Sequence, residues 1–366
     1  MPLLDRRSVL SGLIGSGLAA TSVISQSRAA TSGPRAKDLA AARGLLFGSA
    51  FDEFVYRERD YGQLLRDECQ ILTPDYSLKF GSIRPAPGVT KFSAADRLFA
   101  FAERDNLLMR GHNLIWNEFQ PEWVRQLSKS EMSSLLDRHI DEVAGRYSGR
   151  VHSWDVVNEP IWPDHNNVGG LRGGPWFAAL GPEYIDRSFR RARQADPKAK
   201  LVLNDAGLEG GIPLAYRRRE YFLRLVKRLL DSGVPVDAIG FESHLSAPEG
   251  YDHDALLEFV QLIQDLGLDI YITELDVGDA RLPEDVDTRD RIVADVYRRY
   301  LSDMVQFSSL KVIITWELSD KFSWRADEAR AGRSQRWPRT LPFDIHMQPK
   351  PAYQAIIDAI GKRQPI

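Results

Sequence analysis

The sequence predicts a (β/α)8 barrel, in which eight parallel strands alternate with helices and close into a cylinder. The first observation is that, beyond Gly44, short apolar segments alternate with segments that have helical periodicity. The second is the length of 366 residues, which accommodates one such barrel of about 250 residues. A doubly wound open sheet is the alternative, but no glycine-rich phosphate-binding sequence follows the first expected strand.

Eight apolar segments are expected to form the strands. They are residues 45–51, 70–80 (extended only in its first part), 107–116, 151–159, 200–205, 238–244, 269–274 and 311–316. The intervals carry apolar residues at a spacing near 3.6, as amphipathic helices do. Gly233 and Gly267 each follow such a pattern and are expected to end a helix.

The N-terminal segment has the features of an export signal. Arg6 and Arg7 precede a short apolar stretch, and Ser27 and Ala29 supply small residues before a cleavage site. The apolar stretch is too short to span a bilayer. We therefore expect residues 1–30 to be a twin-arginine signal peptide, 31–42 a linker that leads into a helix, and 43–362 the single catalytic domain. The mature protein would be periplasmic or secreted and would have no membrane segment.

Composition excludes several classes of protein. A hydrophobic content of 43% and a charged content of 27% are typical of a soluble globular chain, and we expect a monomer. The formal net charge of -3 argues against nucleic acid and membrane surfaces as partners. Cys69 is the only cysteine, so no intrachain disulfide is possible, and apolar neighbours indicate that it is buried. The histidines show no metal-ligand spacing, so we expect no metal site.

Two glutamates stand at the ends of expected strands. Glu159 ends the segment 151–159, and Pro160 then prevents the strand from continuing. Glu274 ends the segment 269–274 in the same way. Either glutamate alone is most simply a solvated or salt-bridged residue. The C-terminal ends of barrel strands all meet at one face, however, and a pair of carboxyl groups is what glycosidic cleavage needs.

Other polar and aromatic residues fall at the same strand ends. They are Lys79, His112, Trp116, Asn158, Asn204, Asp205, Glu242, His244 and Trp316. Any one of them could be structural. Their joint placement predicts a functional site at the C-terminal face of the barrel.

Two motifs resemble those of a known family. Residues 154–160, Trp-Asp-Val-Val-Asn-Glu-Pro, and 272–277, Ile-Thr-Glu-Leu-Asp-Val, resemble family 10 glycoside hydrolases, the endo-β-1,4-xylanases. The likeness extends from Phe47 to about Tyr353. It implies hydrolysis of xylan with retention of configuration and without a cofactor, with Glu274 as nucleophile and Glu159 as acid/base. On this basis His244 donates a hydrogen bond to Glu274, and negative charge and burial raise the pKa of Glu159.

The resemblance also implies a sugar-binding set. Asn158 would contact the sugar 2-hydroxyl, while Lys79 and His112 would line the glycone side. Trp316 and Trp324 would form an aromatic wall, because the flat C–H faces of sugars stack on such rings. A buried structural tryptophan is the alternative for each. The remaining expected binding residues are Trp116, Asn204, Glu242 and His244.

Several positions depart from the family pattern. Asp75 and Tyr76 replace Glu-Asn, Phe80 replaces Trp, Asn117 and Phe119 replace His and Gln, Ala206 replaces an aromatic residue, and Glu242 replaces Gln. If Glu242 is buried, it should titrate together with Glu159 and Glu274, and its protonated form would mimic the amide donor. A related β-glycanase acting on decorated xylan or β-1,4-glucan is therefore one alternative. A non-catalytic carbohydrate-binding barrel is another, but both glutamates are present.

Overall fold

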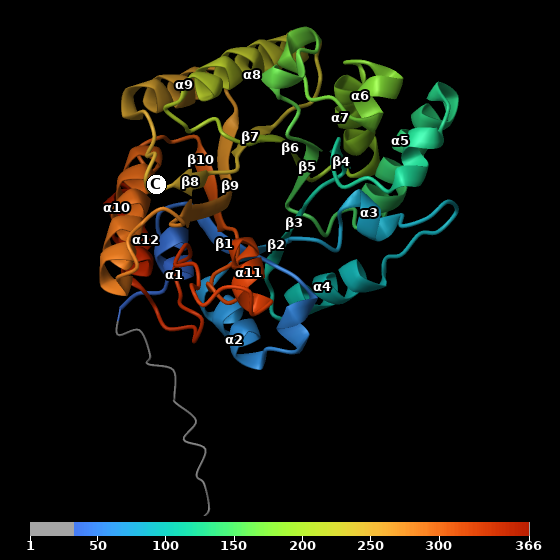
Figure 1. Cartoon of the computed structure of the whole chain (residues 1–366). Coiled ribbons are helices and arrows are strands. Elements are labelled where there is room, and N and C mark those ends of the chain that lie inside the picture. Colours follow the sequence, from blue (N-terminus) through green and yellow to red (C-terminus); the bar gives the residue numbers. More distant parts are fainter. Residues whose placement is uncertain (1–32, 366) are drawn as a thin grey trace, which may run out of the picture. The chain divides into compact units, whose positions relative to one another are not determined.

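The computed structural model describes residues 33–365, which contain a closed barrel of parallel strands surrounded by helices (Figure 1). The strands of the ring are β1 Leu46–Phe51, β2 Ile71–Pro74, β3 Leu108–Gly111, β5 Ser153–Asn158, β6 Lys200–Asp205, β7 Ala238–Phe241, β9 Asp269–Gly278 and β10 Leu310–Thr315. Neighbours pair in this order, and pairing of β9 with β10 closes the ring. The predicted (β/α)8 barrel is confirmed.

Three predicted strands differ from the structure by a break or an extension, and others by a residue or two at their ends. The segment 107–116 is divided into β3 and β4 Ile115–Trp116, with a cis peptide bond between His112 and Asn113. The segment 238–244 is divided because Ser243 has a φ of 62°, and β8 His244–Ser246 follows. β8 pairs with the end of β9, which explains why β9 runs past Glu274 to Gly278.

Helices cover the outer face of the sheet (Figure 1). The longer ones are α2 Arg59–Glu68, α4 Ser93–Arg104, α5 Lys129–Arg146, α7 Tyr184–Ala195, α8 Pro213–Asp231, α9 His253–Asp265, α10 Val286–Met304 and α12 Pro351–Lys362. Shorter helices are α1 Ala36–Ala41, α3 Phe80–Ile83, α6 Pro175–Leu180 and α11 Asp327–Arg330. Gly233 and Gly267 follow α8 and α9 with positive φ, as predicted. The apolar faces of the helices pack on the sheet and form the main core, which includes Cys69, buried as predicted.

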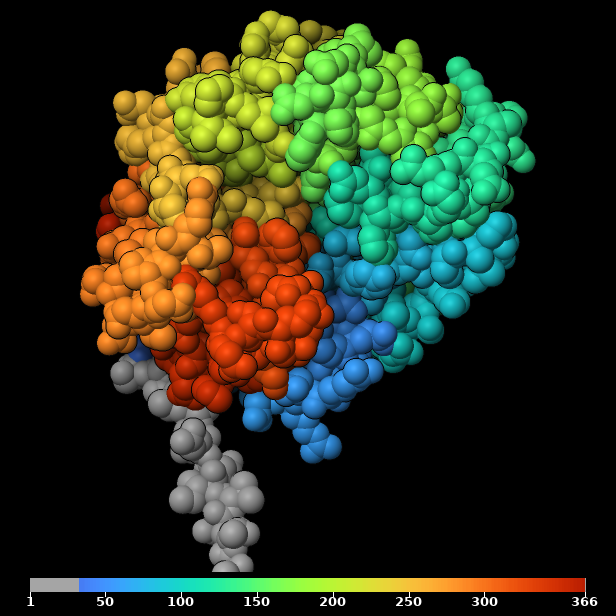
Figure 2. All heavy atoms as spheres, viewed as in Figure 1, coloured from blue at the N-terminus to red at the C-terminus, as the bar shows by residue number. Residues whose placement is uncertain are grey.

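A second, smaller core fills the inside of the barrel. Its buried members are Ile71, Val202, Ala238, Tyr271, Val312 and Ile314. Side chains from several strands therefore occupy the cylinder, as in other barrels of this type. The filled interior makes the barrel a rigid support. Figure 2 shows the outer surface of the protein in the view of Figure 1.

The described part of the chain begins just before α1. Ala36 and Ala40 of this helix are buried in the main core, so the expected lead-in is largely a packed helix. The predicted signal peptide, 1–30, lies outside the described residues and stays a prediction, as does its destination. No helix within residues 33–365 combines the length and hydrophobicity needed to cross a membrane.

Candidate active site

Glu159 and Glu274 reach the same end of the barrel. Glu159 directly follows β5, and Glu274 lies in the C-terminal half of β9. All the strands of the ring are parallel, and only β6 and β7 separate β5 from β9. The charge of Glu274 contributes to raising the pKa of Glu159.

Asn204, at the end of β6, connects the two acids. Its side-chain Nδ2 lies 2.7 Å from Asn158 Oδ1 and 3.1 Å from Glu274 Oε1. Its backbone oxygen accepts a hydrogen bond of 2.8 Å from the Glu159 N–H. Gly240 on β7 makes room for this amide, because a Cβ at that position would lie 2.1 Å from Asn204 Oδ1. The predicted residue Asn204 therefore acts as the central connector of the site.

Cationic and polar groups stabilise the ionised form of Glu274. His244 Nε2 lies 3.3 Å from Glu274 Oε2, which confirms the predicted contact. His112 Nδ1 lies 3.9 Å from Oε1. Burial acts to raise the pKa of Glu274, but His112, His244 and Lys79 outweigh it, and the pKa lies below its ordinary value. Glu274 is thus an ionised carboxylate at neutral pH.

His244 is held between two carboxylates. Its Nδ1 lies 3.2 Å from Asp276 Oδ1, on the side opposite Glu274. Burial acts to lower the pKa of His244, but Asp276 and Glu274 raise it to about 10. Sequence analysis missed Asp276, although it stands two residues after Glu274 and therefore on the same face of β9. It also accepts hydrogen bonds of 2.6 Å from Trp324 Nε1 and 3.0 Å from Arg325 Nη2.

The charge of His244 leads to a testable expectation. In a His244→Gln variant the pKa of Glu274 should rise, so the acidic limb of the kcat/KM profile moves to higher pH. Because the folded pKa of His244 is about 10 instead of 6.5, its contribution to stability is complete below pH 6.5 and is lost as the pH rises toward 10. Between pH 6.5 and 10, the Tm of the His244→Gln variant should therefore fall less than the Tm of the wild type. A His253→Gln control, at an exposed histidine paired with Asp303, should leave the acidic limb in place.

The surroundings of Glu159 differ from those of Glu274. Burial raises the pKa of Glu159, Arg172 opposes this, and the charge of Glu274 adds to the rise, so the pKa lies above its ordinary value. The predicted direction is confirmed. Arg172 forms an ion pair with the Glu159 carboxylate and donates a hydrogen bond of 2.9 Å to its backbone oxygen. Glu159 has a φ of 47°, a conformation that is uncommon outside glycine and is often found at functional sites.

Arg172 and Asp155 are two further residues that sequence analysis missed. Arg172 lies in the irregular segment between β5 and α6, where no periodic pattern signals it. Asp155 is fully buried on β5 and lies 3.0 Å from His112 Nδ1. It also pairs with Arg110, and it thereby fixes the orientation of the His112 ring. Asp155 stands four residues before Glu159, a spacing that places both on one face of a regular strand. This spacing is the signal that could have indicated Asp155.

Aromatic rings surround this charged centre. Trp316 follows β10, is 5% exposed, and has its ring centroid 5.3 Å from that of His112. Trp324 is 47% exposed, and its ring centroid lies 5.4 Å from that of His244. Lys79 Nζ lies 5.4 Å from the Trp116 ring centroid and 5.8 Å from that of Trp316. Direct contacts thus join Lys79 and the aromatic residues to the histidines beside Glu274.

Three of the positions that depart from the family pattern have different surroundings. Asn117 is structural, because its Oδ1 accepts hydrogen bonds of 3.1 and 3.3 Å from the Trp176 and Phe177 N–H groups at the start of α6. Tyr76 and Phe119, by contrast, are exposed and pack edge to face with a centroid distance of 4.9 Å. They follow β2 and β4, so they form an aromatic pair at the same end of the barrel.

One group of side chains raises the question of a metal ion. Ligand atoms of Glu242, His244 and Glu274 lie within 4.8 Å of one another. His244, with a pKa of about 10 and both nitrogens directed at carboxylates, is protonated at neutral pH. A protonated imidazole has no lone pair for a metal. The chemistry of this donor set therefore does not favour a metal ion.

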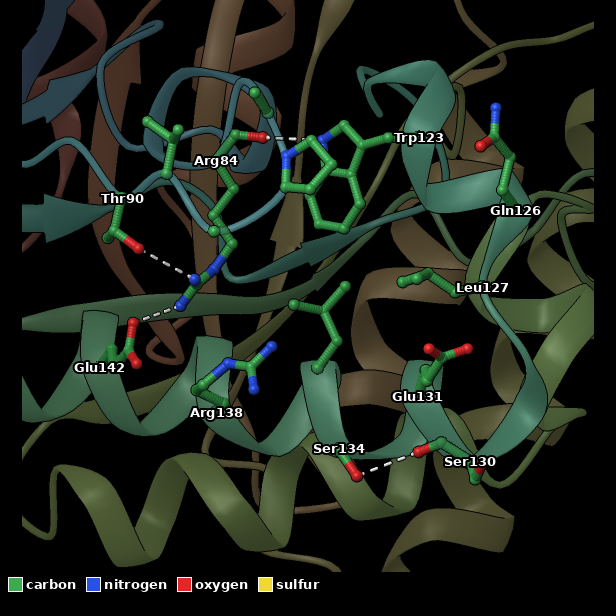
Figure 3. Close-up of a pocket in the computed structure, with 15 residues that line it drawn as sticks. Arg84, Thr90, Trp123, Gln126, Leu127, Ser130, Glu131, Ser134, Arg138 and Glu142 are labelled. Carbon is green, nitrogen blue, oxygen red and sulfur yellow. Dashed lines mark hydrogen bonds and ion pairs between the residues drawn. The ribbon is translucent and has the colours of Figure 1, made fainter.

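A groove of about 870 Å³ lies elsewhere, along α5 (Figure 3). None of the predicted site residues lines it. Its polar groups are largely paired with one another: Arg84 Nη1 lies 3.1 Å from Thr90 Oγ1, and Ser134 Oγ donates a 3.0 Å hydrogen bond to the Ser130 backbone oxygen (Figure 3). The Trp123 indole N–H is directed to the Arg84 backbone oxygen at 3.3 Å. This groove lacks the converging acids of the barrel mouth.

Two carboxyl groups with opposite pKa shifts at the mouth of a parallel barrel are the arrangement that a glycoside hydrolase requires. The model of Glycosyl hydrolase family 10 matches residues 35–359, and the chain belongs to this family. It is 32% identical over 305 residues to endo-1,4-beta-xylanase B of Thermotoga neapolitana, covering 83% of this chain and 84% of that protein. It is 33% identical over 306 residues to a beta-1,4-xylanase of Dictyoglomus thermophilum, covering 81% and 84% of the two chains.

Solved structures show the same relationship. Native xylanase 10B from Thermotoga maritima superposes with a TM-score of 0.81 at 31% identity, covering 90% of this chain and 98% of that one. Xylanase 10B from Thermotoga petrophila RKU-1, solved in complex with xylobiose, gives a TM-score of 0.81 at 32% identity, covering 91% and 99%. The family resemblance predicted from the two glutamate motifs is therefore confirmed.

Proposed function

We propose that this protein is a retaining endo-β-1,4-xylanase in which Glu274 is the nucleophile and Glu159 the acid/base. The observation that carries the proposal is that the surroundings of two acids in one site change their pKa values in opposite directions. Positive neighbours hold the pKa of Glu274 below its ordinary value, while burial raises that of Glu159. A double displacement needs this division, with one carboxylate ready to attack and one carboxylic acid ready to protonate.

The reaction follows from these protonation states. In the first step a Glu274 oxygen attacks the anomeric carbon, the glycosidic bond breaks, and the Glu159 proton passes to the leaving oxygen. In the second step ionised Glu159 takes a proton from water, and the water oxygen displaces Glu274 from the sugar. Arg172 stabilises the ionised form of Glu159, which the second step requires. The two inversions together retain the configuration of the anomeric carbon.

The sugar-binding roles are also proposals. Asn158 contacts Asn204, which contacts Glu274, so its side chain is placed beside the reacting centre and suits the sugar 2-hydroxyl. Lys79 and His112 suit hydroxyl groups on the glycone side. Trp324 offers an exposed ring for stacking, while Trp316 is mostly buried and supports His112.

A substrate panel tests the proposed activity. Xylan, arabinoxylan, β-glucan, an aryl xyloside and an aryl cellobioside are given to the wild type, and released reducing ends are measured. The expected result is the highest kcat/KM on a xylan. A preference for β-glucan or the cellobioside would replace xylan with a glucan as substrate. Turnover of none of them, with retained binding to one, would indicate a non-catalytic carbohydrate-binding barrel.

The exposed aromatic pair leads to a prediction about chain length. We expect the double variant Tyr76→Ala, Phe119→Ala to raise KM for long xylo-oligosaccharides roughly threefold to tenfold, if a sugar stacks on these rings about as strongly as one aromatic ring on another, which contributes about 0.5–1.5 kcal/mol. The effect on the short aryl xyloside should be much smaller. Tyr216→Ala removes another exposed aromatic side chain, on α8, and serves as the matched control. Equal effects on both substrates would contradict a role of the pair in binding distant sugars.

A further inference from the structure

Glu242 is a third carboxyl group in the active site. It directly follows β7 and is 3% exposed. One ligand atom each from Glu242, His244 and Glu274 lie within 4.8 Å of one another, so Glu242 is next to the proposed nucleophile. Neither step of the proposed mechanism uses it.

The hydrogen-bond donors around Glu242 are committed to other groups. Asn204 Nδ2 has two hydrogens and three acceptors within reach: Asn158 at 2.7 Å, Glu274 at 3.1 Å and Glu242 at 3.3 Å. The two closer acceptors satisfy the amide. His244 directs its Nε2 to Glu274 as well. An ionised Glu242 would therefore be a buried carboxylate without a full complement of donors, which is strongly unfavourable.

The charges that face Glu242 act in the same direction. Glu274 on β9, Glu159 after β5, and Asp205 and Glu209 on and after β6 are all acidic. The positive charge of His244 is shared between Glu274 and Asp276. Burial in the first place, and then the charge of Glu274, raise the pKa of Glu242 well above its ordinary value.

We propose that Glu242 is a neutral carboxylic acid in the resting enzyme and donates its O–H to a hydroxyl group of the sugar bound over Glu274. Among the described residues, Asn204 is the one hydrogen-bond donor to the Glu242 carboxyl group, at 3.3 Å from Oε1. That contact uses Oε1, so in this proposal Oε2 carries the proton and donates it to the sugar. The site thus holds three acids with different surroundings: Glu274 has its pKa lowered, Glu159 has its pKa raised, and Glu242 is the acid proposed to stay neutral. The inference rests on the proposed function for the identity of the ligand but not for the protonation state.

The protonation state is measured without substrate. Infrared difference spectra of the full-length wild type minus Glu242→Gln at neutral pH should show the C=O stretch of a carboxylic acid. Carboxylate bands in its place would overturn the inference. The experiment does not need activity, so it remains decisive even if xylan proves not to be the substrate.

Donation to the sugar is measured with two replacements of similar size. Gln keeps an N–H donor at this position, and Met keeps the volume without a donor. The kcat/KM of Glu242→Met should be roughly tenfold below that of Glu242→Gln on the best substrate of the panel, since an unmade buried hydrogen bond costs about 1–3 kcal/mol. Equal values would overturn the donor role, and melting temperatures show whether both variants are folded.

The pH profile gives an independent readout. An ionised Glu242 would raise the pKa of Glu159, so its replacement by neutral Gln would move the alkaline limb of kcat/KM to lower pH. If Glu242 is already neutral, the alkaline limb in Glu242→Gln stays in place or moves to higher pH. A move to lower pH would overturn the inference.

Discussion

Glu274→Ala is expected to lower kcat on xylan by roughly four orders of magnitude or more, because it removes the group that forms the covalent intermediate. The fold should be retained, and the shorter Ala side chain leaves a cavity lined by Asn204, His112 and His244 in the C-terminal half of β9. Added azide should enter this cavity and attack the anomeric carbon of an activated aryl xyloside. The product would be an α-glycosyl azide, formed with a single inversion.

The matched control for this variant is Glu249→Ala. Glu249 lies in the loop after β8, where the ion-pair partner of its side chain among the described residues is the exposed Arg281. The Glu249→Ala variant should keep the wild-type kcat, and the Glu249→Ala and Glu274→Ala variants should have a similar Tm. A Glu274→Ala enzyme with substantial kcat and no azide product would contradict the assignment of Glu274 as nucleophile.

Glu159→Ala is expected to have an effect that depends on the leaving group. On xylan, loss of the proton donor should lower kcat by about 10²–10⁴-fold. An aryl xyloside with an acidic phenol needs no protonation, so its first step should stay fast while the second, which needs the base, becomes slow. The covalent intermediate should then accumulate, with a burst of phenol and an intact mass increased by the sugar.

The pH profile adds a check on Glu159. In the wild type its pKa is raised above the ordinary value, so the alkaline limb of kcat/KM should report loss of its proton. That limb should be absent when the variant acts on the activated substrate. The same alkaline limb in wild type and variant would show that another group titrates there. A uniform loss of rate for all leaving groups would contradict a role as acid/base.

Much of this site could be predicted because parallel strands place their ends together. The strand ends pointed to Glu159 and Glu274 as a pair, and the resemblance supplied their roles and those of His112, His244 and Asn158. Closure of the barrel then brings together residues that are far apart in sequence, as the Asn204–Glu274 hydrogen bond of 3.1 Å shows. The periodic part of the sequence therefore indicated the end of the barrel at which the site lies, and the two glutamate motifs identified it.

The rest could not be predicted because it depends on irregular backbone. Arg172 reaches Glu159 from a segment without periodic structure. The strands 107–116 and 238–244 each contain a break, and the breaks set the positions of His112 and Glu242. Asn117 could not be recognised as a helix-capping residue before its contacts with α6 were known. These features depend on side-chain contacts between distant segments, which no local pattern records.

Identification of the labelled residue after inactivation by a 2-deoxy-2-fluoro xylobioside with a good leaving group tests the central claim most directly. The fluorine slows both steps, and the good leaving group lets the first proceed, so the intermediate is trapped. Peptide mass spectrometry should place the sugar on Glu274, and a structure of the adduct should show Glu159 within about 5–5.5 Å of it, as retaining enzymes require. A label on Glu242 or any other residue, or no label on an active enzyme, would contradict the account.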